Sequence, residues 1–102
     1  MSSVDGASLR AARAELLIEN KHLRVFRYTI EPGTHIGHHR HARPYLVTTL
    51  AGGRLIFSDA AGDRAVEIPT GQVAFHPAGI EHDISNHGPD TVVNIEAELK
   101  GE

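Results

Sequence analysis

A cluster of histidines is the feature of this sequence that most clearly suggests chemistry. Eight of the 102 residues are His, and four of them, His35, His38, His39 and His41, fall within seven positions. Histidine is the commonest metal ligand and carries protons near neutral pH. The cluster lies inside the chain and is interrupted by Ile, Gly and Arg, so it is not a purification tag. Metal binding and proton transfer are therefore the first chemistries to consider.

Two of these histidines have the spacing of metal ligands on a strand. Residues i and i+2 of an extended strand point to the same face, roughly 6–7 Å apart. The imidazoles of His39 and His41 could therefore converge on one ion at about 2.0–2.1 Å each. A helical pairing of His35 with His39 is disfavoured, because Gly37 and Pro44 interrupt the segment.

His82 is the candidate for a third ligand. The run 72–75 ends before Pro77, the chain turns at Gly79, and His82 begins the next run. An inward-pointing His82 opposite the first pair would complete a set of three. Three buried histidines without a shared partner would be costly, because each has two ring nitrogens to satisfy. The alternative is a pocket that has lost its metal and keeps these side chains as polar lining.

Short runs rich in β-branched, leucine and aromatic residues would position these side chains. Gly, Pro, Asn and Asp separate the runs, which cover 15–19, 23–30, 45–50, 54–59, 65–68, 72–75, 82–86 and 91–99. This spacing predicts an all-β sandwich or barrel. A parallel α/β sheet is disfavoured, because no helical segment lies between the runs. A short helical turn, capped by Ser8, is expected over residues 9–16.

Alternation along the runs predicts which side chains share a face. In the run 91–99 the polar side chains Asn94, Glu96 and Glu98 alternate with apolar ones. Period-two patterning indicates one buried and one wet face. We expect Glu96 and Glu98 on the solvated face, with a ligand role for Glu96 as the alternative. His76 is expected to point outward, with a catalytic base as the alternative.

Two stretches resemble the two motifs of the cupin superfamily. The first motif has a glycine, two histidines two residues apart and a closing glycine, which here are Gly33, His39, His41 and Gly52. Tyr45 stands where this motif usually has Glu. The second motif matches at every fixed position, with Gly71, Pro77, Gly79, His82 and Asn86. Together they span 33–86, about half of the chain. The His-Arg-His segment and the run 95–100 are also similar to small cupins of β-alanine breakdown.

The resemblance implies a fold and a metal. The fold would be a double-stranded β-helix, or jelly roll, of about eight to ten strands. It would form one domain over 1–102, with 1–14 as an N-terminal extension that is frayed over 1–7. The glycines of the two motifs would adopt positive φ at turns, and Asn86 would bond to backbone at a turn. One divalent ion (Fe, Zn, Ni, Cu or Mn) would be held by His39, His41 and His82.

The missing Glu affects the chemistry that the resemblance implies. A three-His site leaves the charge of the ion unneutralised and so favours an anionic or enolate ligand. Three-His sites occur in cupin dioxygenases that act on thiols and β-diketones, which makes an iron-dependent dioxygenase the leading function. A non-catalytic module for a small ligand or metal is the alternative, followed by a purely structural barrel.

Side chains around the expected ion would form a pocket for a small molecule. Tyr45 is a poor ligand while protonated, since its ordinary pKa is about 10. We expect Tyr45 to wall the cavity or to act catalytically as a donor to bound substrate. The remaining pocket walls are expected to be Phe26, Tyr28, Val47 and Phe75.

Composition narrows the partners. The net charge is −3, so no basic stripe is available for nucleic acid. No stretch approaches ~18 apolar residues, so no membrane span is expected. The chain has no Cys and its first residues lack a signal-peptide pattern, which favours a cytoplasmic location. Exposed edge strands favour a homodimer, to which residues 15–19 would contribute.

Overall fold

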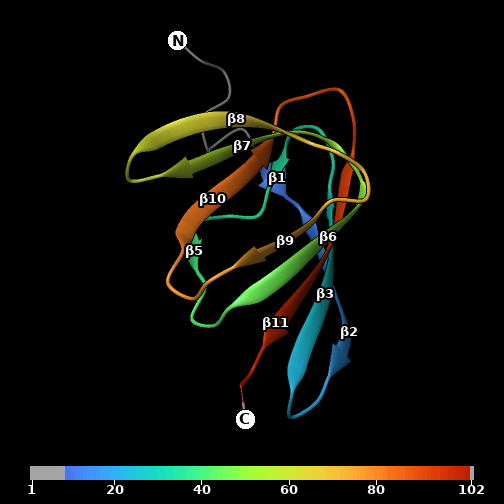
Figure 1. Ribbon diagram of the computed structural model, residues 1–102. Helices are drawn as coiled ribbons and strands as arrows, with labels where there is room; N and C mark the ends of the chain where they lie inside the picture. Colours follow the sequence, from blue (N-terminus) through green and yellow to red (C-terminus); the bar gives the residue numbers. More distant parts are fainter. Residues whose placement is uncertain (1–8, 102) are drawn as a thin grey trace.

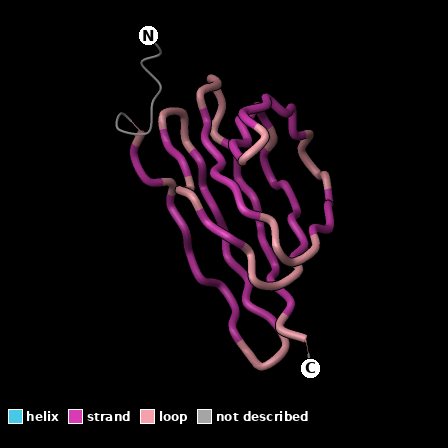
Figure 2. The backbone as a smooth tube through the Cα atoms, turned by 90° about the vertical axis from the view of Figure 1, so that its left-hand side faces the viewer, coloured by secondary structure: helices cyan, strands magenta, loops and turns pink. Residues whose placement is uncertain are grey.

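The protein folds into two β-sheets that face each other (Figure 1). The structure is a computed structural model that describes residues 9–101, and over this range the chain forms strands and loops without a helix (Figure 2). The strands are β1 (Arg10–Ala11), β2 (Arg13–Glu19), β3 (Leu23–Ile30), β4 (Thr34–His35), β5 (His39–Arg40), β6 (Tyr45–Ala51), β7 (Gly53–Asp59), β8 (Gly62–Ile68), β9 (Val73–His76), β10 (Glu81–Asn86) and β11 (Val92–Leu99).

The strand order is that of a double-stranded β-helix. The first sheet has the order β1-β4-β10-β7-β8, with β5 also paired to β10, and the second has the order β2-β3-β11-β6-β9. From β9 to β11 each strand lies in the sheet opposite its predecessor, and β6 and β7 alternate in the same way. Every pairing is antiparallel except that of β1 with β4. The predicted all-β jelly-roll class is therefore confirmed.

The eight predicted runs correspond to eight of the strands, and β3 has the predicted bounds. β1, β4 and β5 were not predicted, because they are two residues long and therefore too short to show a period. The helical turn expected over 9–16 is wrong, since residues 10–16 lie in and between β1 and β2. Strand pairing with distant parts of the chain outweighs the helix propensity there. For example, Ala12 N donates to His35 O at 2.8 Å. The expectation of fraying over 1–7 falls outside the described residues.

No helix among the described residues is long and apolar enough to cross a membrane.

Hydrophobic packing and one buried side-chain amide stabilise the core of the barrel. Ile30, Leu55, Ile68 and Val92 form the buried core. Asn86, which is fully buried, donates from Nδ2 to Ile30 O at 2.7 Å and to Asp90 O at 2.8 Å, and its Oδ1 accepts from Gly88 N at 2.9 Å. The expectation that Asn86 bonds to backbone at a turn is confirmed.

A close backbone approach explains one motif glycine. A Cβ on Gly52 would lie 2.1 Å from Ile68 O, which no side chain can accommodate without moving the backbone. Gly79, in contrast, has φ +100° at the turn that leads into β10. Positive φ was expected at Gly52 as well, but that glycine is required by space and not by its φ.

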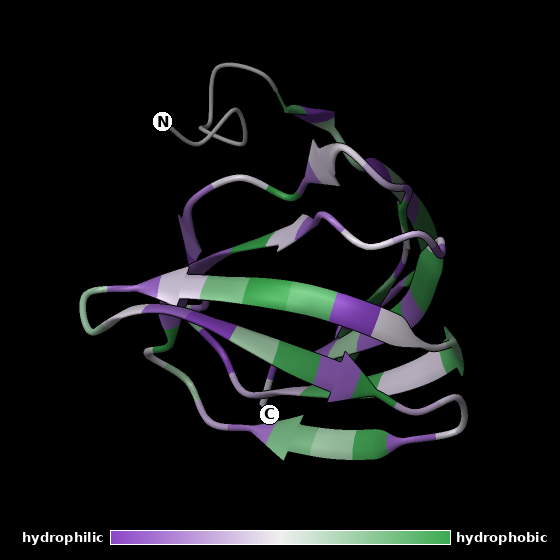
Figure 3. Cartoon of the chain, turned by 90° about the horizontal axis from the view of Figure 1, so that it is seen from above, coloured by the Kyte–Doolittle hydropathy of each residue, from purple (hydrophilic) through white to green (hydrophobic). Residues whose placement is uncertain are grey.

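The outer face of the second sheet carries a row of apolar side chains. Cross-strand registers place Ile18, Val25, Ala97, Leu46 and Phe75 in one row across its five strands. Ile18 is 51% and Phe75 59% exposed. Apolar residues lie along the strands of both sheets (Figure 3). On this sheet Leu46 and Phe75 alternate with Tyr45 and His76, which line the cavity, so the apolar row faces away from the barrel interior.

We predict that Asn86→Ala destabilises the protein by about 2–4 kcal/mol, because the buried backbone carbonyls that Asn86 now satisfies would lose their hydrogen-bond donor. Asn20→Ala is the matched control. Its Oδ1 accepts from His22 N and Leu23 N in an exposed turn, so we expect a loss of about 1 kcal/mol or less. Urea denaturation measures both losses. Equal losses would contradict the stabilising role of the buried Asn86 hydrogen bonds.

Candidate metal centre

The pairing of β5 with β10 brings the three predicted ligands together. The register places His39 directly opposite His82. His41 follows one residue beyond β5, where its N donates to Ile80 O at 2.8 Å and its O accepts from Gly79 N at 2.7 Å. These bonds attach the chain at His41 to the turn before β10. Candidate ligand atoms of the three residues lie within 4.8 Å of one another.

The donor geometry fits a divalent ion. The Nε2 atoms of His39 and His41 are 2.9 Å apart, and two nitrogens bound to one ion at about 2.0–2.1 Å lie about 3 Å apart when they meet at a right angle. The Nδ1–H of His39 donates to Gly37 O at 2.7 Å, which leaves Nε2 with its lone pair. The Nε2 of His82 is buried with no hydrogen-bond partner among the described residues, an arrangement that an ion would satisfy.

Burial keeps two of the imidazoles in the form that binds metal. Burial lowers the pKa of His41 to about 4, with the neighbouring His39, His82 and His76 adding to the effect. Burial likewise lowers the pKa of His82 to about 4, helped by His39, His76 and Arg64. Both side chains are less than a tenth exposed. At pH 7 both are therefore neutral, as a metal ligand must be.

Tyr45 occupies the motif position of the usual Glu, but its protonated phenol is not a carboxylate ligand. Its ring lies between two imidazoles, 3.9 Å from that of His41 at an interplanar angle of 22° and 5.0 Å from that of His76 at 28°. The side chain is buried, and burial raises the pKa of the phenol above its ordinary value of 10. Tyr45 is thus a protonated hydroxyl whose ring sets the plane of His41.

Glu96 lies inside the barrel, so the expectation that it is solvated is wrong. Its side chain is 16% exposed and lines the cavity, with Oε2 3.8 Å from Nδ1 of His41. Burial raises the pKa of Glu96 to about 7, and the nearby Glu98 carboxylate adds to this rise. Alternation separated the two faces of β11 correctly, but the polar face of this strand is the one that faces inward. No sequence signal distinguished the two assignments.

The cavity of about 300 Å³ lies between the two sheets. Its walls come from the second sheet (Tyr28, Tyr45, Val47, Thr49, Ala74, His76, Asn94 and Glu96), from the first (Phe57, Arg64, Val66, Ile68, His82 and Ile84) and from loop residues Ile36 and Gln72. The cavity thus combines apolar walls with His82, His76 and a few other polar groups, as small-molecule sites do.

Two of the four predicted pocket walls lie elsewhere. Tyr28 and Val47 line the cavity. Phe26 packs against Tyr28 with ring centroids 5.9 Å apart and is not a lining residue. The prediction for Phe75 is wrong, because this residue pairs with Leu46 on the outer face of the sheet. The outward assignment of His76 is wrong for the same reason, since His76 is the inward neighbour of Phe75 on β9.

The other clustered histidines stay outside the site. His35 Nδ1 lies 3.0 Å from Asp83 Oδ2, and Gly37 N donates to the other oxygen of that carboxylate at 3.0 Å. His38 Nε2 lies 2.7 Å from Glu81 Oε2. These contacts attach the loop before β5 to β10 and so help to hold His39 in place.

The fold and the three clustered histidines are those of a cupin, and the comparisons agree. The family model described as "Cupin domain" matches residues 26–97, so the chain belongs to the cupin family. It is 35% identical over 83 residues to the β-alanine degradation protein BauB of Pseudomonas aeruginosa, covering 81% of this chain and 87% of that protein.

Solved structures agree with the fold. The chain is similar to the crystal structure of a cupin domain from Bordetella pertussis, with a TM-score of 0.87 and 27% identity over 91% of this chain and 97% of that one. An RmlC-like cupin from Methanocaldococcus jannaschii gives a TM-score of 0.72 at 12% identity, covering 87% and 80% of the two chains. The second likeness concerns the fold alone.

The lowered pKa of His82 predicts a pH dependence of stability. The unfolded chain binds a proton at His82 below its ordinary pKa of 6.5, whereas the folded chain does so only near 4. The free energy of unfolding contributed by neutral His82 is therefore complete above pH 6.5 and is lost as the pH falls toward 4. At pH 5 the loss is about 2 kcal/mol. Urea denaturation of metal-free wild type and His82→Gln between pH 7.5 and 5 measures it, and parallel pH profiles would contradict it.

Proposed function

We propose that this cupin is a metal-dependent enzyme that acts on a small anionic or enolisable molecule, most simply as a dioxygenase. One divalent ion would be held by His39, His41 and His82. The observation that carries the proposal is the convergence of their ring nitrogens, including the buried Nε2 of His82 that has no other partner among the described residues. Such an ion would supply Lewis acidity and, if it is iron, a site for oxygen.

The residues of the chain would orient the ligands and the substrate. Gly37 O fixes the ring of His39 through Nδ1, and the stacked ring of Tyr45 fixes that of His41. The phenol of Tyr45 stays protonated at neutral pH because burial raises its pKa, so it can donate a hydrogen bond to an oxygen of the substrate. The cavity would surround a small molecule and keep most bulk water from it.

The curated relative suggests where to look for substrates. The name of that protein assigns it to β-alanine degradation. We propose that the substrate of this chain is a small acid of the same chemical kind. A short carboxylic acid suits both the volume of about 300 Å³ and an ion whose charge the three neutral imidazoles leave unbalanced.

A non-catalytic ligand-binding module is the second candidate. The observation that favours it is the replacement of the usual motif carboxylate by Tyr45, which cannot accept a proton at neutral pH. Under this alternative the same cavity would bind a small acid reversibly without turnover.

We also propose a homodimer. Ile18, Leu46 and Phe75 of the apolar row are exposed on the outer face of the second sheet, and β2 and β9 are the edges of that sheet. A second copy placed there would cover exposed apolar area and an unpaired edge.

The metal site predicts a definite composition. Protein purified without chelators or nickel affinity resin should contain about one divalent ion per chain by elemental analysis. His82→Ala should weaken metal binding by more than about 100-fold, since even residues outside the ligand set cost 10–100-fold. His22→Ala, an exposed histidine outside the site, should bind as wild type does. Unchanged affinity in His82→Ala would remove the basis for the site.

Oxygen uptake distinguishes the two candidate functions. The Fe(II)-loaded protein should consume O₂ with at least one short acid, thiol or β-diketone. Tyr45→Phe should lower kcat by about 10–100-fold with unchanged iron content, because it removes a proton donor but keeps the ring. Binding of these compounds without oxygen uptake would instead favour the ligand-binding module.

The dimer proposal predicts a charge-sensitive face. Phe75→Glu should shift sedimentation from dimer to monomer at micromolar concentration, because it places a charge within the apolar row. Ala60→Glu, in the exposed β7–β8 turn, should remain a dimer. A wild-type monomer at that concentration would refute the proposal.

A further inference from the structure

Glu96 is the only carboxylate among the described residues that line the cavity, and the proposed metal site does not use it. Its Oε2 lies 3.8 Å from Nδ1 of His41, on the opposite side of that ring from the Nε2 that faces His39. In the structure it therefore stands beside the ligand set and outside it.

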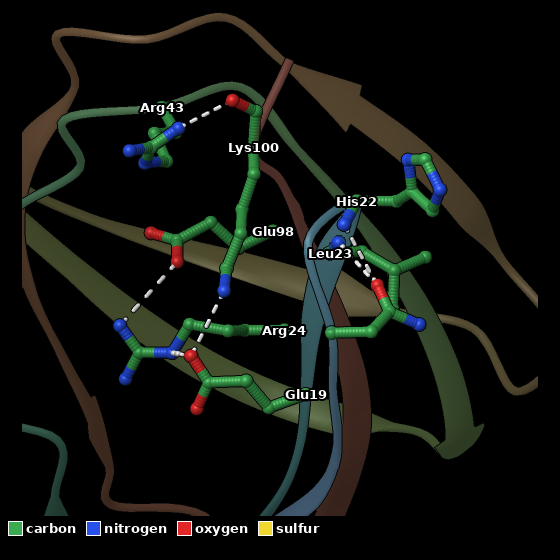
Figure 4. A network of polar contacts seen from close by, with 8 residues as sticks. Glu19, His22, Leu23, Arg24, Arg43, Glu98 and Lys100 are labelled. Atoms are coloured by element: carbon green, nitrogen blue, oxygen red, sulfur yellow. Dashed lines mark hydrogen bonds and ion pairs between the residues drawn. The ribbon is translucent and has the colours of Figure 1, made fainter. Parts of the chain in front are cut away.

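No cation of the described chain neutralises Glu96. Within residues 9–101, Glu96 lies beside the neutral imidazole of His41, and no Lys or Arg forms an ion pair with it. The basic side chains nearby have other partners. Arg24 pairs with Glu98 and Glu19 (Figure 4), and Arg64 pairs with Asp59. With no cationic side chain paired to it within the described chain, Glu96 is free to bind a cationic group of a ligand in the cavity.

The surroundings of Glu96 suit a protonated amine. Tyr28 and Tyr45 line the same cavity, and the strand registers place them opposite Asn94 and Glu98, the residues two positions before and after Glu96 on β11. A carboxylate combined with aromatic rings is a common way of binding an ammonium group, through a charge-assisted hydrogen bond and cation–π attraction.

We infer that Glu96 binds the ammonium group of a small zwitterion whose carboxylate is directed to the proposed ion. This inference rests on the proposed function for the ion-binding end of the ligand. The two binding ends lie on opposite sides of the His41 ring, so the ligand must hold its two charges further apart than an α-amino acid does, and the small cavity limits its length. The substrate class is therefore a short amino acid with its amine beyond the α position.

Ligand titration of the zinc-loaded protein tests this assignment. The probes are 3-aminopropanoate and 3-hydroxypropanoate, which have the same carbon chain and differ in the charge of the end group. Wild type should bind the amino acid at least about tenfold more tightly, the usual effect of a hydrogen bond between charged groups. Glu96→Gln should retain zinc and the hydroxy acid but bind both compounds equally.

Glu98→Gln is the matched control. Glu98 lies two residues along the same strand and pairs with Arg24 at 3.7 Å, so it should keep the preference for the amine. Equal binding of the two compounds by wild type, or an unchanged preference in Glu96→Gln, overturns the inference and leaves the metal site standing. Loss of zinc from Glu96→Gln also overturns it, since Glu96 would then support the metal site. A wild-type protein that does not hold zinc overturns the proposed function, and the inference with it.

Discussion

The short antiparallel contact between β5 and β10 is the constraint on which the site depends. It places His39 opposite His82, two residues that are 43 positions apart in the chain. A two-residue strand is a weak anchor by itself, and the loop contacts reinforce it. The backbone bonds of His41 to Ile80 and Gly79 act on one side. On the other side, the side-chain carboxylate of Asp83 contacts His35 Nδ1 and accepts from Gly37 N. Three imidazoles with low conformational freedom result, which is what a preorganised ligand set requires.

The second constraint is that the polar side chains of β11 face the cavity. Asn94 and Glu96 of β11 face the cavity, while Ala97 belongs to the apolar outer row. A closed barrel of this size leaves an interior that side chains only partly fill. The inward polar side chains of β11 make that interior suitable for a charged small molecule. The outward apolar row forms a surface that a second copy would cover. The ligand proposal and the dimer proposal both depend on which face of the second sheet is turned inward.

Most of the fold was predictable from the sequence, because turn residues and β-branched runs act locally. The run 23–30 predicted the bounds of β3, and the spacing of His39, His41 and His82 identified three side chains that the structure brings together. The direction in which side chains face was less predictable. Phe75, His76 and Glu96 were all assigned to the wrong face, because alternation is symmetric and burial of apolar residues was assumed to decide it. Only the sheet pairing resolves that choice.

X-ray absorption spectroscopy of the metal-loaded protein tests the central claim most directly, because it reports the atoms around the ion whether or not the protein turns over any substrate. The account predicts three imidazole nitrogens at about 2.0–2.1 Å, with the remaining ligands being water or added acid. A spectrum with oxygen ligands alone, or with one imidazole that persists in His39→Ala, His41→Ala and His82→Ala, would contradict it.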